Sequence, residues 1–134
     1  GAVEFLDSLS KAGVARALVT SSADDKMEVL WKRHPRLRDC FEAVVTGSMV
    51  KKSKPNPEGY LTAAKLLGFD PSDCFVFEDS IQGLQAGRAS GATVIALSTT
   101  NPRSVVARYS DLVLDGIGGY TVAEMIGLKE NISR

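Results

Sequence analysis

Cysteine and histidine are scarce in this chain, which has two cysteines and one histidine among its 134 residues. Cys40 and Cys74 are far apart and form no paired spacing, so neither a zinc site nor a redox motif is predicted. Both lie beside apolar residues, and we expect buried, reduced thiols in a cytoplasmic protein. His34 lies in a basic stretch where a helix is expected to end, which favours a surface role over catalysis.

Long apolar runs and an excess of one charge are also absent. No stretch approaches the roughly 20 apolar residues of a membrane span, and the first residues have the pattern of an amphipathic helix rather than of a secretory signal. Sixteen basic and sixteen acidic side chains give zero net charge. Because the molecule has no overall field that would attract a polyanion, neither a nucleic acid nor a membrane is an expected partner.

The composition that remains, 44% hydrophobic and 24% charged, is that of an ordinary soluble domain. No repeat or linker divides the chain, so residues 1–134 are expected to form one domain. Expected strands cover 15–19, 41–46, 75–77, 93–97 and 112–114, and expected helices cover 5–12, 24–33, 57–67, 81–90, 102–108 and 121–126. This alternation predicts an α/β fold, a Rossmann-like three-layer arrangement with one parallel sheet between two layers of helices.

The helix over 57–67 has the clearest start and end signals. Asn56 is the expected cap, Pro57 the first helical residue, and Gly68 the residue that ends it. Its buried stripe is expected to contain Tyr60, Leu61, Ala64 and Leu67.

Polar side chains follow three of the expected strands. Thr20 and Ser21 follow the first, Lys54 lies in the loop after the second, and Glu78 and Asp79 follow the third. The carboxyl ends of parallel strands border one crevice, so we expect these groups to meet. A hydroxyl with backbone N–H groups, a lysine, and an acid pair that holds Mg²⁺ are what a phosphoryl group requires.

Each group also has a plain structural alternative. Glu78 and Asp79 could form a surface turn, with Asp79 or Ser80 capping the next helix. Thr20 could cap a helix, and Lys54 could be a solvated loop residue. The occurrence of all three groups at successive strand ends favours the phosphate and Mg²⁺ site.

Three segments together resemble the second, third and fourth motifs of the haloacid dehalogenase superfamily, in particular its β-phosphoglucomutase-like, sugar-phosphatase branch. They are residues 18–22, with the sequence LVTSS, residues 54–58, KPNPE, and residues 76–87, VFEDSIQGLQAG. The resemblance extends over almost the whole chain. It implies that Thr20 and the backbone of Ser21 bind the phosphoryl group, that Lys54 neutralises its charge, and that Glu78 and Asp79 hold Mg²⁺ directly or through water.

The chain departs from that family at its first motif. The family's Asp-x-Asp, which supplies the covalent nucleophile and the general acid/base, would precede Gly1, and no such sequence occurs here. The helical cap that selects the substrate would also lie upstream. We therefore expect the C-terminal portion of a core domain whose sheet lacks the family's first strand. Such a sheet is expected to collapse, to pair with another chain, or to retain an upstream fragment.

The resemblance implies that the parent protein is a Mg²⁺-dependent phosphohydrolase or phosphomutase. Its substrate would be a small phosphorylated metabolite, such as a sugar phosphate, and it would react through an aspartyl-phosphate. The chain alone is expected to be inactive. The alternative is a non-catalytic phosphate-sensing or protein-interaction domain that keeps the same cradle.

Overall fold

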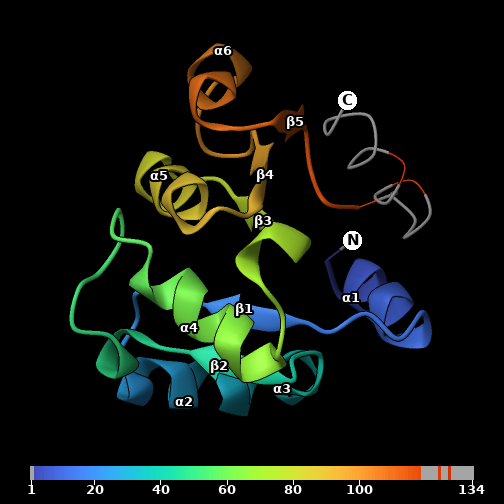
Figure 1. Cartoon of the computed structure of the whole chain (residues 1–134). Coiled ribbons are helices and arrows are strands. Elements are labelled where there is room, and N and C mark those ends of the chain that lie inside the picture. The colour runs from blue at the N-terminus through green and yellow to red at the C-terminus, as the bar shows by residue number, and fades with distance from the viewer. Residues whose placement is uncertain (1, 119–123, 125–126, 128–134) are drawn as a thin grey trace.

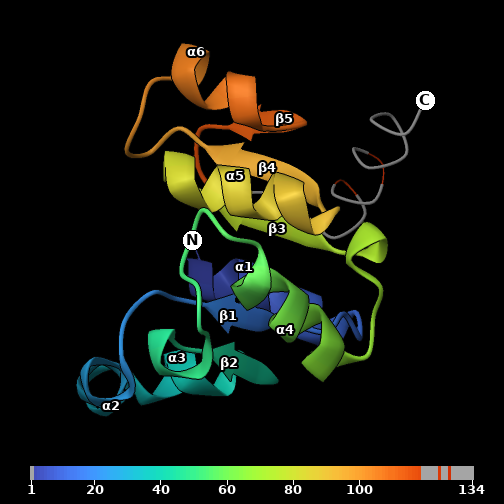
Figure 2. The same cartoon turned by 60° about the vertical axis from the view of Figure 1, so that its left-hand side comes forward.

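The computed structural model of the chain describes residues 2–118, 124 and 127. Its five strands form two parallel sheets. β1 (Ala17–Val19) pairs with β2 (Ala43–Val45), and a second sheet has the order β3 (Phe75–Glu78), β4 (Thr93–Leu97), β5 (Leu112–Leu114). Within the described residues no ladder joins β1 to β3 (Figure 2). This arrangement confirms the predicted α/β class and agrees with a sheet that lacks an inner strand.

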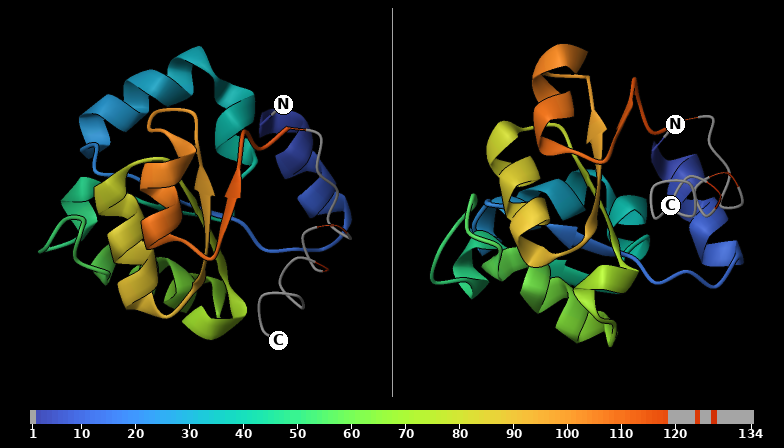
Figure 3. Two further views of the ribbon diagram at one scale, coloured as in Figure 1. Left: turned by 90° about the horizontal axis from the view of Figure 1, so that it is seen from above. Right: turned by 45° about the horizontal axis from the view of Figure 1, so that its top comes forward.

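Helices cover the strands on both faces. They are α1 (Ala2–Lys11), α2 (Asp24–Arg33), α3 (Pro35–Asp39), α4 (Glu58–Leu67), α5 (Ile81–Ser90) and α6 (Arg103–Val106). Figures 1 and 3 show α1 on one side of the strands and α5 on the other. Single 3₁₀ turns at Gly47–Met49, Pro71–Asp73 and Ala107–Tyr109 complete the connections.

The core lies on the two faces of β4, because successive residues of a strand point to opposite sides. Ile95 is fully buried and packs with Phe5 of α1, whereas Val94 and Ala96 pack with Leu84 of α5. At Gly87, an added Cβ would lie 3.0 Å from the side chain of Val76, so α5 approaches β3 closely.

Several local expectations need correction. α2 ends at Arg33, as predicted, but Pro35 then begins the short helix α3, since proline is well suited to a first helical turn. Pro57 is the residue before α4 rather than its first residue, although the Asn56 side chain does accept a hydrogen bond from the Glu58 N–H, at 3.0 Å. Leu61 is 42% exposed and does not belong to the buried stripe of α4.

The two cysteines differ in their surroundings. Cys40 is buried, as predicted, and its thiol donates to the carbonyl of Arg36. Cys74 is only partly buried, because it precedes β3 at the end of a surface turn. The expected last helix, over 121–126, falls almost entirely outside the described residues. No helix in the described part of the chain has the length and apolarity needed to cross a membrane.

Candidate functional site

The loop after β1 is held in place by the turn that follows β2. The Thr20 N–H donates to the carbonyl of Val45, and the Gly47 N–H donates to the carbonyl of Ser22, at 2.8 Å. An added Cβ at Gly47 would lie 2.3 Å from the Ser21 carbonyl oxygen, so this turn can approach the loop only without a side chain. The Thr20 hydroxyl oxygen accepts from the Ser22 N–H, which leaves the hydroxyl proton available to a ligand.

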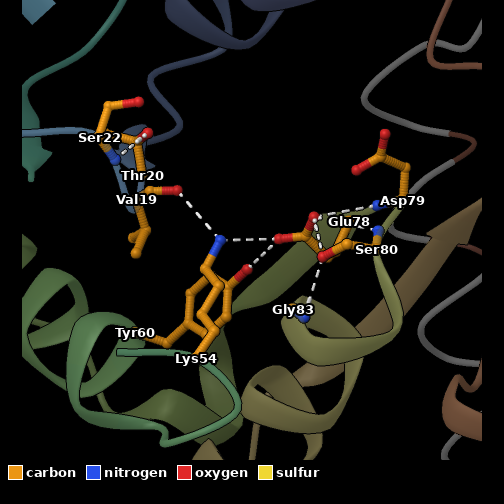
Figure 4. Close-up of polar contacts among 9 residues, drawn as sticks. All are labelled: Val19, Thr20, Ser22, Lys54, Tyr60, Glu78, Asp79, Ser80 and Gly83. Carbon is orange, nitrogen blue, oxygen red and sulfur yellow. Dashed lines mark hydrogen bonds and ion pairs between the residues drawn. The ribbon is translucent and has the colours of Figure 1, made fainter. Parts of the chain in front are cut away.

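Lys54 reaches from its loop to the ends of two strands that belong to different sheets. Its ammonium donates to the carboxylate of Glu78, at 2.9 Å, and to the backbone carbonyl of Val19, at 3.3 Å (Figure 4). The Lys54 side chain is only 16% exposed. The structure therefore places Lys54 between the loop of Thr20 and the acid pair, and not in bulk solvent.

The carboxylate of Glu78 is surrounded by protein donors. Oε2 accepts from the Tyr60 hydroxyl, at 2.6 Å, and from Lys54, while Oε1 accepts from the Asp79 N–H, the Ser80 N–H and the Ser80 hydroxyl. These five hydrogen bonds occupy both oxygens. Glu78 is therefore fixed in one orientation, toward Lys54.

Two pKa values reflect this cluster. Burial opposes ionisation of Glu78, but the hydrogen bond from Tyr60, the hydrogen bond and charge of Lys54, and the Ser80 N–H outweigh it and lower the pKa of Glu78 to about 2. Burial, and then the negative charge of Glu78, raise the pKa of the Tyr60 hydroxyl above its usual range. At neutral pH the cluster therefore contains an ionised carboxylate and a protonated phenol that donates to it.

Asp79 is positioned by the turn that follows β4. The Thr100 hydroxyl donates to Asp79 Oδ2, at 2.6 Å, and the Asn101 side chain donates to the Asp79 carbonyl, at 3.2 Å. Figure 4 shows the Asp79 carboxylate apart from the Lys54–Glu78 ion pair, above it in this view. Within the described residues no hydrogen bond is found at Asp79 Oδ1, which leaves this oxygen available to a cation.

The acid pair supplies only part of a cation site. Glu78 and Asp79 are hard oxygen donors of the kind that Mg²⁺ takes from proteins. In the part of the chain that the structure describes, no group of three or more His, Cys, Asp or Glu side chains gathers around a point. The residues present thus fit Mg²⁺ as one or two ligands, with the rest of its shell left to water, phosphate or another segment.

A cavity of about 690 Å³ lies beside the site, between the two sheets. Its walls are mainly apolar and come from β1, β3, α1 and α4; among the lining residues are Phe5, Leu9, Leu18, Val19, Ala64 and Phe77. Tyr60 and Glu78 also line it, so the cavity reaches the Lys54 cluster.

Three residues of this site are not predicted by the sequence patterns. The pattern of α4 predicts Tyr60 in an apolar stripe, and its hydroxyl is the one signal that marks it as a partner for a buried charge. Thr100 and Asn101 follow the fourth strand, at the same edge as the other groups, and this topology could have revealed them.

The chain is similar to known proteins over most of its length. Residues 1–91 match the family model described as a haloacid dehalogenase-like hydrolase. The hexitol phosphatase A of Escherichia coli (strain K12) is 39% identical over 127 residues, which cover 92% of this chain and 56% of that protein. The chain spans about half, or less, of the length of the first curated relatives that it matches.

Solved structures of two similar proteins have the same fold as this chain. A HAD hydrolase, family IA, variant 3, from Entamoeba histolytica superposes with a TM-score of 0.88 at 28% identity, covering 98% of this chain and 60% of that one. CbbY from Rhodobacter sphaeroides, solved in complex with phosphate, has a TM-score of 0.82 at 26% identity and covers 94% of this chain and 57% of that one.

Proposed function

This chain belongs to the haloacid dehalogenase-like hydrolase family, and we propose that it is the C-terminal part of the core of a Mg²⁺-dependent phosphohydrolase or phosphomutase. The proposed substrate is a small phosphorylated metabolite of the sugar phosphate class, in keeping with the name of the hexitol phosphatase relative. The observation that carries the proposal is the position of Lys54. Its ammonium joins the strand end before Thr20 to the strand end that bears the acid pair.

The residues of this chain have distinct roles in the proposed site. The Thr20 hydroxyl and the Ser21 N–H bind phosphoryl oxygens, and Lys54 neutralises the charge that they carry. Asp79 would hold Mg²⁺ directly, and Glu78, whose oxygens already accept hydrogen bonds, would hold it through water. The metal, when bound, lowers the electrostatic cost of bringing an anionic nucleophile to a phosphate.

The nucleophile is proposed to come from an Asp-x-Asp segment that precedes residue 1 in the whole protein. The first aspartate forms a bond to phosphorus while the bond to the sugar oxygen breaks, and the second gives that oxygen a proton. Water then hydrolyses the aspartyl-phosphate to free phosphate, or, in a mutase, a second sugar hydroxyl takes the phosphoryl group.

The cavity is the proposed place of that segment. Successive residues of a strand direct their backbone groups to opposite sides, and the Thr20 N–H is directed to β2. The Val19 carbonyl is therefore directed away from β2, toward the cavity, where Lys54 is its partner. An apolar strand between β1 and β3 would supply backbone partners at this edge, where each buried group left without one costs about 1–3 kcal/mol.

A cytoplasmic location is part of the proposal, since the buried free cysteine Cys40 is suited to a reducing compartment.

Asp79 offers a direct test of the metal role. In the whole protein, Asp79→Asn is expected to raise the Mg²⁺ concentration for half-maximal phosphate release by roughly tenfold or more, because one charged ligand is lost. Asp39→Asn, at an exposed aspartate of α3, is the matched control and should leave that concentration unchanged. Unaltered Mg²⁺ dependence in Asp79→Asn would remove the metal assignment.

A second test separates the enzyme from the alternative of a phosphate-sensing domain. The chain alone is expected to release no phosphate from sugar phosphates and not to behave as a monodisperse monomer in size exclusion with light scattering. Adding a peptide that contains the Asp-x-Asp segment should restore both turnover and a defined mass. Phosphate binding without turnover, in a whole protein that has the Asp-x-Asp segment, would favour the sensing domain.

A further inference from the structure

We propose that Tyr60 is a positioning residue that fixes the Lys54 ammonium and the Glu78 carboxylate at the phosphate site. The inference rests on the proposed function, because it assigns Tyr60 a role in the same site. Tyr60 acts through Lys54 and Glu78 and is not proposed to touch the phosphoryl group itself.

The position of Tyr60 is set by the close approach of α4 to β1. An added Cβ at Gly59 would lie 2.9 Å from the Val19 side chain, so the first turn of α4 lies directly against the strand end that Lys54 contacts. The next residue, Tyr60, is directed toward the Lys54 and Glu78 side chains (Figure 4). A shift of α4 would therefore move Tyr60 and the Val19 carbonyl together.

Tyr60 contacts both members of the ion pair. Its hydroxyl donates to Glu78 Oε2 at 2.6 Å, and the Lys54 ammonium lies 5.1 Å from the centroid of its ring. Lys54 also donates to Glu78 Oε2. Tyr60 thus provides a hydrogen bond for the carboxylate and an aromatic face for the cation.

Without Tyr60, the Lys54 ammonium and the Glu78 carboxylate would be held in position less firmly. A lysine has a flexible four-carbon stem, so its ammonium stays in one place only where several partners surround it. Here the partners lie on three separate elements: Val19 on β1, Tyr60 on α4 and Glu78 on β3. Because Tyr60 and Lys54 share one carboxylate oxygen, Glu78 neutralises Lys54 less completely, and positive charge remains for a phosphoryl group.

Two substitutions separate the hydroxyl from the ring. Tyr60→Phe removes the hydrogen bond to Glu78 and keeps the aromatic face, whereas Tyr60→Leu removes both. Tyr109→Phe is the matched control, because Tyr109 packs beside the Leu84 and Val106 core cluster, away from Lys54.

The first readout is the ¹H–¹⁵N signal of the Lys54 ammonium in the ¹⁵N-labelled whole protein, assigned by its loss in Lys54→Arg. Tyr60→Phe is expected to shift and broaden this signal, Tyr60→Leu to abolish it, and Tyr109→Phe to leave it unchanged. A Lys54 signal that is identical in Tyr60→Phe, Tyr60→Leu and the unsubstituted protein would overturn the proposal.

The second readout is the affinity of the whole protein for inorganic phosphate, measured by calorimetry in the presence of Mg²⁺. Tyr60→Phe is expected to weaken binding about tenfold, as for one lost hydrogen bond to a charged group. Affinity within about twofold of the unsubstituted protein in both Tyr60 variants would overturn the proposal. If the unsubstituted protein bound no phosphate, the proposed function would fail, and the Lys54 signal would still decide whether Tyr60 positions Lys54.

Discussion

The half of the molecule built on β3, β4 and β5 has a core on both faces of β4, whereas in the half built on β1 and β2 the strand β1 borders the cavity, which β3 lines from the other side. Val94, Ile95 and Ala96 of β4 are at most 1% exposed, but all three residues of β1 are only half-buried. The proposed ligand groups are divided between these halves, with Thr20 on the first and the acid pair on the second. Lys54 joins the two halves through Val19 and Glu78. The most fully buried strand thus belongs to one half of the molecule, and Thr20, a proposed phosphate ligand, belongs to the other.

Truncating one apolar side chain in each half should give the largest difference in the free energy of unfolding. Leu84→Ala, at a side chain with 0% exposure, is expected to lower the free energy of unfolding by about 2–5 kcal/mol. Leu18→Ala should cost less than about 1.5 kcal/mol, because Leu18 already faces the cavity and little new void is created. Urea unfolding of both variants measures the difference, and equal losses would mean that the cavity is filled in solution.

Hydrogen exchange compares the halves without a substitution. Amides of β1 are expected to exchange roughly a hundredfold faster than those of β4, as for a difference in opening free energy of about 3 kcal/mol. Adding the Asp-x-Asp segment should slow exchange in β1 and leave β4 unchanged. Uniform protection across both sheets would show that the molecule opens as a single unit.

Gly47 lies in the turn after β2 and packs against the loop of Thr20 and Ser21, which is the proposed phosphate-binding loop. Gly47→Ala places a methyl group against the Ser21 carbonyl and is expected to destabilise the fold by about 1–3 kcal/mol and to weaken phosphate binding. Gly116→Ala is the control, since an added Cβ there meets no atom within 4 Å. Calorimetry with inorganic phosphate and thermal unfolding would measure both effects, and a Gly47→Ala chain that matches Gly116→Ala in both would contradict the close approach.

The smallest expected effect is the pH dependence of the free energy of unfolding that comes from Glu78. Its pKa in the fold, about 2, lies below the ordinary 4.5, so its contribution to stability is complete above pH 4.5 and is lost as the pH falls toward 2. We expect a loss on the order of 1–2 kcal/mol, allowing for solvent screening.

Glu78→Gln should lack this part of the pH dependence, and Glu28→Gln, at an exposed carboxylate of α2, should keep it. Urea midpoints measured between pH 2 and pH 5 make the comparison. Parallel pH profiles for the two variants would exclude Glu78 as the source.

The sequence by itself determined the order and type of the elements. Apolar runs such as 93–97 fit a buried parallel strand, and glycines at 68 and 91 end α4 and α5 in the left-handed conformation that a glycine adopts readily. It also placed Thr20, Glu78 and Asp79 at strand ends, because these polar residues follow the apolar runs directly, and it placed Lys54 in the loop after the second strand. These are local signals, and they needed no knowledge of the packing. Phosphate and Mg²⁺ binding by these residues stays a prediction.

Only the tertiary structure decided how those groups meet. Lys54 is 24 residues from Glu78 and 35 from Val19 in the chain, so no spacing rule could predict that one ammonium contacts both. The contact of Tyr60 with Glu78 arises because Gly59 lets α4 approach β1, and the hydrogen bond from Thr100 to Asp79 arises because β3 and β4 are neighbours. Burial then makes these contacts strong, since a charge removed from water depends on the few donors that the fold brings to it.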